Sequence, residues 1–428
     1  MRGLGRFSAL AEDEFDFRTE AEAGLAGFMA LAYTFLVNAL LLERAGVFFG
    51  EAYMALVLSF AVANIAAALL TRQPLILVPG IAVNMYFSYI IVVSNGIPYG
   101  EGLALLLFAS LTFGVISFSG WRQKIMDAVP LVIRQGMRAG VGALLLLLGL
   151  SFGGIIVVSP FQLTSFGDLG NPAAYLTVSG FLLTAGLKIN KVRGAYFAGM
   201  VFTAAGAIML GCIDWPGGIF CLPAGMERTI CGWSFNNLAE HLGFGLMLLF
   251  IMLFDSSIAV SALFEGKDSQ NSLAVCYKAD SAGGIISAFL GVAPAVYTPE
   301  AAVACQYGGK TGLVPAVAAC IGLAALFCGP IVRELACCPA VIAPLLIFTG
   351  LELFSSIGRV MCKDMPETVS VYLMVFLMAL TNNPALGLGA GIVLFVLLKL
   401  LSGCREELTG EMYGLAMVFV LYFINLAI

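Results

Sequence analysis

Charged residues are scarce in this sequence. Asp, Glu, Lys and Arg make up 11% of its 428 residues, against about 25% in an ordinary soluble domain, while 61% of the residues are hydrophobic. A single water-soluble core cannot bury that much apolar surface, so the chain is expected to be a polytopic membrane protein with about a dozen or more spanning helices. The composition and the formal net charge of −5 exclude a secreted enzyme, a DNA-binding protein and a disulfide-stapled small domain.

Other common signals are also missing. Residues 1–20 carry charges throughout and no apolar run, so no cleavable signal peptide is expected and the N-terminus is predicted to be cytoplasmic. The 11 cysteines lack metal-ligand spacing and no ATP-binding motif is present, so no metal, cofactor or primary transport is expected. Cys221 and Cys231 lie in the longest polar loop, and whether they form a disulfide depends on the redox compartment of that loop.

The apolar runs predict an all-α membrane protein with fourteen segments. The candidate segments are 24–43, 52–71, 75–94, 100–119, 138–158, 172–187, 194–212, 242–263, 278–292, 294–308, 312–332, 337–356, 367–382 and 385–402. A further apolar stretch at 412–427 is shorter and more interrupted, and either a span or an interfacial anchor fits it.

Lys and Arg are unevenly distributed between the two sides that this count defines. With the N-terminus inside, only Arg44, Arg228 and Arg333 of the 21 basic residues fall outside, in agreement with the retention of positive charge in the cytoplasm. The protein is therefore predicted to lie in the bacterial inner membrane. A basic cluster near the fifth segment is interpreted as a topology determinant facing anionic lipid, not as a nucleic-acid site. Its members are Arg122, Lys124, Arg134 and Arg138.

A long loop divides the segments into two groups of seven. The loop spans residues 213–240 and is predicted to be external; it separates residues 1–212 from residues 241–402, which are followed by a C-terminal tail at 403–428. Because seven is odd, the second group enters the membrane in the opposite orientation. This arrangement is that of an inverted-topology repeat.

The third segment of each half is broken by proline. Residues 74–85 read PLILVPGIAVNM and residues 293–302 read APAVYTPEAA, and both patterns predict a short strand that leads into a half-helix. Thr298 is a good N-cap directly before Pro299, which suits the first turn of a helix. Non-helical backbone inside a membrane needs protein or a water-filled cavity around it, so the matched breaks predict a shared substrate site near the midplane. Proline kinks without a function are the alternative.

Three acidic residues stand out inside the predicted segments, namely Asp255, Glu300 and Glu352. A charge at the bilayer centre costs roughly 2.5–3.5 kcal/mol and persists mainly where it has a function. No Lys or Arg is expected at the same depth, so these carboxylates are predicted to be unpaired and able to take up a proton. Glu352 lies closer to a helix end and alternatively snorkels toward water.

Motifs along nearly the whole chain resemble those of the AzgA-like purine permeases, the adenine, guanine and hypoxanthine branch of the nucleobase-cation symporters within the nucleobase/ascorbate transporter superfamily. They lie at 23–38, 79–84, 121–130, 253–255, 297–300 and 308–313. The resemblance implies a seven-plus-seven inverted repeat with two domains. Segments 1–4 and 8–11 form a core domain, and segments 5–7 and 12–14 form a gate domain.

The resemblance also implies a purine bound between the third and tenth segments. Carried over position by position, Asp255 and Glu300 are the acidic ligands and the proton carriers, and Asn84 is the amide partner. The other residues expected beside the base are Phe254, Met85, Tyr297 and Thr298. The family usually has Asp-Thr and Glu-Ser at the two acidic positions. Here Ser256 follows Asp255 and Ala301 follows Glu300, and because a lost hydrogen-bond partner changes discrimination by orders of magnitude, the preferred base stays open.

The sequence therefore predicts a secondary active transporter, not an enzyme, that imports adenine, guanine or hypoxanthine with protons by alternating access. Sodium coupling and a homodimer stay open, lipid is the expected surrounding, and no nucleic-acid partner is expected. Three alternatives carry less weight: a uracil or xanthine transporter lacks its Gln-Asn signature, a sulfate or bicarbonate transporter would hold its anion against Asp255 and Glu300, and an intramembrane aspartyl protease lacks its Gly-x-Gly-Asp context.

Overall fold

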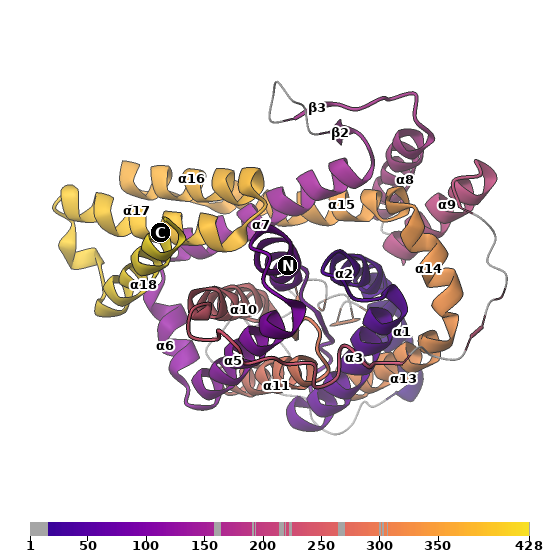
Figure 1. Ribbon diagram of the computed structural model, residues 1–428, viewed down its shortest axis with the longest axis horizontal. Helices are drawn as coiled ribbons and strands as arrows, with labels where there is room; N and C mark the ends of the chain where they lie inside the picture. Colours follow the sequence, from indigo (N-terminus) through magenta and orange to yellow (C-terminus); the bar gives the residue numbers. More distant parts are fainter. Residues whose placement is uncertain are drawn as a thin grey trace.

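A computed structural model shows a mostly helical protein in which helices from both halves of the sequence lie side by side (Figure 1). The residues that it describes are 16–157, 164–190, 192, 194–213, 218, 220–221, 225–263, 270–298, 301, 304–305 and 307–427. Among these residues, seven helices are long and apolar enough to cross a membrane, and several shorter apolar helices accompany them.

The helices fall on the apolar runs of the sequence. In the first half they are α1 (Phe17–Leu31), α2 (Tyr33–Arg44), α3 (Phe49–Thr71), α4 (Ile81–Met85) with the π-helix η2 (Tyr86–Ser94), α5 (Tyr99–Phe118), α6 (Trp121–Ala128), α7 (Leu131–Phe152), α8 (Pro172–Ile189) and α9 (Ala195–Met209). In the second half they are α10 (Leu242–Leu263), α11 (Gln270–Phe289), α13 (Leu313–Ala325), α14 (Gly329–Cys337), α15 (Ala343–Phe354), α16 (Met365–Thr381), α17 (Pro384–Leu401) and α18 (Gly410–Ala427).

Two helices begin earlier than the sequence pattern predicts. α7 begins at Leu131 rather than near 138, so that Arg134 and Arg138 lie in its first turns, and α11 begins at Gln270 rather than near 278. For α7 the predicted boundary falls at Arg138, the last basic residue of the run. Long basic side chains extend from a helix end toward water, so they do not mark the end of the helix itself.

The C-terminal helix α18 is part of the packed interior. Met412, Phe419 and Tyr422 are buried, and the ring of Phe419 lies 5.0 Å from that of Phe250 in α10. The hydroxyl groups of Tyr422 and Tyr86 are 3.3 Å apart, which joins α18 to η2. Helix α18 therefore packs against α10 and η2 with its buried face.

Elements of the first half pack directly on elements of the second. α3 lies against α11 and α13, α5 lies against α10 and α11, and α7 lies against α15 and α16 (Figure 1). Glycines bring α7 and α15 into backbone contact: a Cβ added at Gly142 would lie 2.7 Å from the Gly350 oxygen, and one at Gly350 would lie 2.8 Å from the Gly142 oxygen. Small residues allow such close packing where no hydrophobic effect drives helices together.

A two-stranded antiparallel sheet lies among these helices. Strand β1 (Leu77–Pro79) pairs with β4 (Ala295–Tyr297), with Val78 opposite Val296. Every residue of both strands is buried. The strands are those predicted in the third segment of each half, and α4 follows β1 as expected; the start of the helix expected after β4, at Pro299, lies outside the described residues. A second short pair joins β2 (Ile156–Val157) to β3 (Ser165–Phe166).

A buried lysine pairs with three carboxylates from the part of the sequence between α15 and α18. The Lys399 ammonium in α17 is fully buried, 2.6 Å from Asp364, 3.7 Å from Glu367 and 2.5 Å from Glu407. The three carboxylates lie close enough together to suggest a metal site, but the ammonium already occupies the centre of the group. Burial works against ionisation of Asp364, yet the hydrogen bonds from Lys399 and from the Glu367 N–H bring its pKa below the ordinary 3.8.

Replacing Lys399 by Met is expected to lower the stability of the folded protein by about 2 kcal/mol near neutral pH, because three carboxylates then face one another without their cation. The depressed pKa of Asp364 means that its contribution is present above pH 3.8 and is lost as the pH falls below that value. The difference in melting temperature between the Lys399→Met variant and the parent should therefore shrink in that range. Exposed Lys363 provides the control, and equal melting curves for Lys399→Met and Lys363→Met would contradict the assignment.

Candidate functional site

Side chains satisfy the outer edges of the β1–β4 sheet. On the β1 side, the Asn64 amide in α3 donates to the Leu77 carbonyl at 2.8 Å, and the Leu77 N–H donates to the Asn64 carbonyl oxygen at 2.9 Å. On the β4 side, the Tyr297 N–H donates to Asp280 Oδ1 in α11 at 3.1 Å, and the Ala295 N–H donates to Ser287 Oγ at 2.8 Å. Each strand thus has a neighbouring strand on one side and polar side chains of a helix on the other.

Asn84 belongs to a second polar group at the end of β1. Asn38 in α2 donates to the Pro79 carbonyl at 3.0 Å. The Asn84 amide donates in turn to the Asn38 side-chain oxygen at 2.8 Å, and Ser88 Oγ approaches Asn84 Oδ1 at 3.4 Å. All three side chains are buried. The amide predicted to contact substrate therefore lies beside the strand–helix break, where it orders the backbone.

Helix α10 brings Asp255 to the same region, because α10 packs against both α4 and β4. Asp255 is half-buried and is not without an interaction partner. Its neighbour Phe254 is buried and stacks on Phe250 with ring centroids 6.5 Å apart.

The remaining predicted residues lie on α4 and β4 or just beyond. Met85 is buried in a cluster with Tyr33 and Leu36, and Tyr297 is buried in another with Tyr277. Thr298 is half-buried, and its hydroxyl oxygen has no hydrogen-bond partner within the described part of the chain. Glu300 lies outside the described residues. The structure thus groups the elements that carry Asn84, Met85, Phe254, Asp255, Tyr297 and Thr298.

A buried ion pair adjoins this group, and the sequence reasoning missed it. Arg122 of α6 lies 2.8 Å from Asp280, and both side chains are fully buried. The guanidinium also donates to Ser256 and Ser257 of α10, at 2.9 and 2.8 Å. The interpretation of Arg122 as a lipid-facing topology determinant is therefore wrong. A signal was present, because an Asp in an apolar helix requires a cation or a proton.

Aromatic rings complete the surroundings of Arg122. Its guanidinium carbon lies 3.9 Å from the ring centroid of Tyr277 and 4.6 Å from that of Phe113. Stacking on ring faces suits the planar guanidinium, which is weakly hydrated compared with an ammonium. Ser256 also donates to Asp280, so its hydroxyl is bonded within the ion-pair network.

Glu352, the third acidic residue singled out, lies apart from this group. It is exposed on α15, where it accepts a hydrogen bond of 2.5 Å from the Tyr196 hydroxyl and pairs with Lys188 at 3.1 Å. The expectation that no basic residue accompanies it is wrong. Lys188 was expected in a loop between spans, but it lies in the last turn of α8.

The loop 308–313, one of the motifs that carry the resemblance, is fixed by a buried carboxylate of α1. Glu20 of α1 accepts hydrogen bonds from the Lys310 N–H at 2.8 Å and from the N–H and hydroxyl of Thr311 at 3.2 and 3.0 Å. It is 3% exposed. The loop thus serves to hold α1 against the start of α13.

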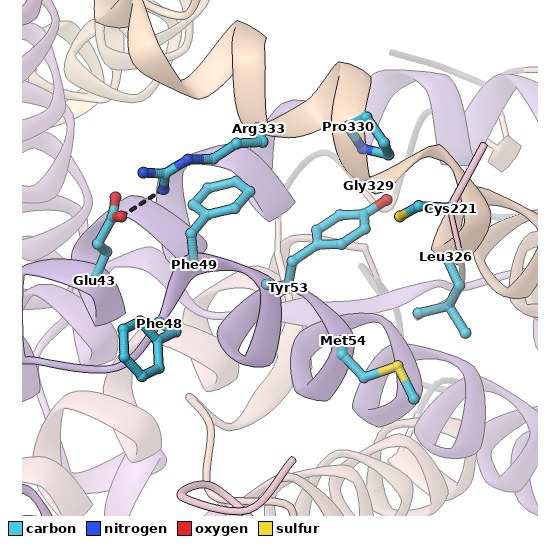
Figure 2. A pocket seen from close by; sticks show the side chains of 11 residues that line it. Glu43, Phe48, Phe49, Tyr53, Met54, Cys221, Leu326, Gly329, Pro330 and Arg333 are labelled. Atoms are coloured by element: carbon cyan, nitrogen blue, oxygen red, sulfur yellow. Dashed lines mark hydrogen bonds and ion pairs between the residues drawn. The ribbon is translucent and has the colours of Figure 1, made fainter. Parts of the chain in front are cut away.

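A pocket of about 410 Å³ lies elsewhere, at the junction of α2, α3 and α14 (Figure 2). The ion pair of Glu43 and Arg333 closes one end, and the Arg333 guanidinium lies 5.0 Å from the Phe49 ring. Tyr53 and Cys221 line the other end. None of the predicted substrate-binding residues that the structure describes lines this pocket. Cys221 and Cys231 are both free thiols in the structure, so the disulfide left open by the sequence is not formed.

Comparison with known proteins identifies relatives over nearly the whole chain, although no protein-family model matches it. A guanine/hypoxanthine permease of Bacillus subtilis, PbuO, is 28% identical over 98% of this chain and 99% of its own length. A putative permease of Methanocaldococcus jannaschii is 29% identical over 96% of each chain. The adenine permease AdeP of Escherichia coli is 26% identical over 98% of this chain and 95% of its own.

Solved structures show the same fold at low sequence identity. The transmembrane domain of the cyanobacterial bicarbonate transporter BicA superposes with a TM-score of 0.63 at 12% identity, covering 87% of this chain and 98% of that domain. The murine anion transporter Slc26a9 gives a TM-score of 0.61 at 12% identity, covering 92% of this chain and 70% of its own.

The fold is therefore that of a multi-pass membrane protein with the architecture of the BicA and Slc26a9 transmembrane regions. Its curated relatives are permeases rather than enzymes. The resemblance seen in the sequence is confirmed: the chain is similar, end to end, to guanine/hypoxanthine and adenine permeases of the nucleobase/ascorbate transporter family.

The role of Asn64 at the sheet edge can be tested with an apolar isostere. Asn64→Leu leaves the N–H and C=O of Leu77 buried without partners, at a cost of roughly 1–3 kcal/mol for each group. We expect a clear loss of folded protein in detergent, measured by the melting temperature and by monodispersity. Asn95→Leu, at an exposed position, is the control. Equal melting temperatures for the two variants would show that the strand edge does not depend on Asn64.

Proposed function

We propose that this protein is a secondary active transporter that imports a purine base, namely adenine, guanine or hypoxanthine, with protons. The observation that carries the proposal is the similarity, over 95–99% of their own lengths, to PbuO and AdeP, whose names state guanine, hypoxanthine and adenine transport. The polar group around the β1–β4 sheet supports it, because it supplies hydrogen-bonding groups in the interior of an otherwise apolar protein.

The binding chemistry follows from the nature of the base. A neutral purine offers ring N–H donors and a flat apolar face, and adenine and guanine add an exocyclic amino donor; carboxylates accept from all of these donors. In this proposal Asp255 and Glu300 accept from the base, Asn84 supplies an amide, and Thr298 supplies its hydroxyl. Phe254, Met85 and Tyr297 supply the apolar surface. Buried polar groups that match the substrate reject analogues lacking the partner, which is how one base is chosen over another.

We also propose the domain organisation of an inverted repeat with a core and a gate. Helix packing supports the division. In the proposed core, α1, α3 and α5 pack against α10, α11 and α13. In the proposed gate, α7 packs against α15 and α16, and α8 packs against α9 and α15. The sheet supports the repeat, since Asn64 of α3 and Asp280 of α11 each accept a hydrogen bond from the backbone N–H of one of two paired residues of β1 and β4. Motion of one group against the other would expose the site on alternate sides.

Contacts between segment ends support the helix count that defines the two sides of the membrane. Segments predicted to be external meet one another at Glu43–Arg333, at the Cys221 N–H with the Phe327 carbonyl, and at the Ser234 N–H with the Gly100 carbonyl. Segments predicted to be cytoplasmic meet at Glu20–Thr311, at Lys399–Asp364 and at the Gly194 N–H with the Tyr307 hydroxyl. Two loops can touch only if they emerge on the same side, so each contact agrees with the distribution of Lys and Arg.

Bicarbonate or another anion is the second candidate substrate, because BicA and Slc26a9 share the fold. Identities of 12% carry the fold alone. An anion at the same place would lie against the carboxylates of Asp255 and Glu300, and like charges in a poorly hydrated site repel strongly. We therefore favour the neutral base.

The proposal predicts that cells lacking their own base permeases take up radiolabelled adenine, guanine or hypoxanthine when they express this protein, and that a protonophore abolishes the uptake. Xanthine, uracil and bicarbonate serve as comparison substrates. Uptake of bicarbonate without any purine would contradict the proposal. Asp255→Asn should reduce purine uptake by about 10–100-fold, the range expected for loss of a hydrogen bond to a charged group. Asp127→Asn, at an exposed position on α6, is the matched control.

The orientation is tested by cysteine labelling in intact cells. A membrane-impermeant maleimide should modify Cys221 and Cys231, which are exposed in the loop proposed to be external. Cys404, beyond α17 on the proposed cytoplasmic side, should react only after the cells are permeabilised. Peptide mass spectrometry distinguishes the three sites. Labelling of Cys404 but not of Cys221 in intact cells would reverse the orientation.

A further inference from the structure

Arg122 contacts both elements that carry the proposed substrate ligands. Through Ser256 and Ser257 it is bonded to α10, directly next to Asp255. Through Asp280 it is connected to β4, because the other oxygen of that carboxylate accepts from the Tyr297 N–H, one residue before Thr298. One guanidinium therefore sets the position of the acidic helix relative to the strand.

The backbone N–H at the outer edge of β4 needs a hydrogen-bond acceptor but not an ion pair. At the equivalent edge, neutral Asn64 satisfies Leu77 without any charge. A buried carboxylate with a buried guanidinium carries a desolvation cost that a neutral amide avoids, so an ion pair at this place is weak evidence for stability. What Arg122 adds over an amide is a rigid fork of donors, which reaches Ser256, Ser257 and Asp280 at once.

The location of Arg122 on α6 connects its hydrogen-bond network to both groups of packed helices. It lies on α6, which joins α5 to α7 along the chain and packs against α5 and α10. α5 packs with α10 and α11, whereas α7 packs with α15 and α16 (Figure 1). Helix α6 is thus one link between the two packing groups, and Arg122 connects that link to the proposed site.

We propose that Arg122 is a positioning residue for substrate, acting through Ser256 and Asp280 to hold α10 and β4 in one binding geometry. This inference rests on the proposed function. Removing Arg122 alone is expected to leave Asp280 buried without its cation and to reduce the yield of folded protein. Neutralising both partners in Arg122→Met/Asp280→Asn removes that defect, since the Asn can still accept from Tyr297. The double variant therefore separates folding from positioning.

The experiment compares the double variant with Lys124→Met, a control at an exposed position on the same helix. We expect both to be folded in detergent to the same extent as the parent. For the purine that the parent transports, the KM of the double variant should rise by about tenfold or more, while uptake at saturating base changes less. Arg122→Lys, which keeps the charge but not the fork, should give an intermediate KM. An unchanged KM in a folded double variant would overturn the proposal.

Hydrogen exchange gives a readout that does not depend on transport. Peptides covering 253–257 and 295–298 should exchange faster in the double variant than in Lys124→Met if Arg122 positions both elements. Unchanged exchange in both peptides would overturn the positioning role. If the parent takes up no purine, the proposed function fails by that result, and the exchange data still decide whether Arg122 holds α10 to β4.

Discussion

The structure depends on the requirement that backbone N–H and C=O groups inside an apolar environment find partners within the protein. Helices meet it by themselves, but β1 and β4 do not. Two paired strands of three residues each are only marginally stable by themselves, and the outer edge of each strand has backbone N–H and C=O groups without a partner strand. Here Asn64, Ser287 and Asp280 act as the missing neighbours. The buried polar residues of α3 and α11 are thus a consequence of having strands at this depth.

That requirement leads from a backbone hydrogen bond to the arrangement of whole helices. At the outer edge of β1, the neutral Asn64 amide completes the hydrogen bonding and needs no counter-charge. Where Asp280 completes it, a cation must follow, and Arg122 supplies it from α6. The position of α6 is then fixed against α10 and α11, and Phe113 and Tyr277 must leave room for the guanidinium between their rings. A single choice of carboxylate over amide therefore constrains α5 and α6 of the first half relative to α10, α11 and β4 of the second half.

Much of the fold could be predicted because its signals are local. Apolar runs placed the helices, and Pro79 and Pro299 marked the breaks at which β1 and β4 were expected. The ion pair escaped because of one boundary. With the ninth segment beginning at 278, Asp280 falls in its first turn, whereas α11 begins at Gln270 and places Asp280 midway along the helix. Lys188 was missed as the partner of Glu352 for a similar reason. Which side chains meet depends on packing between helices, and no local pattern encodes that.

The comparison with BicA and Slc26a9 separates what the fold provides from what side chains decide. Both share this architecture at 12% identity, so the fold does not specify a substrate. Helix starts and backbone N–H groups inside such a fold would favour an anion. Under the proposed function, the carboxylate of Asp255 reverses that preference, because it repels anions and accepts hydrogen bonds from neutral donors. On that proposal, the charge placed beside the strands distinguishes a base from an anion, and the residues that hold the charge in position matter as much as the charge itself.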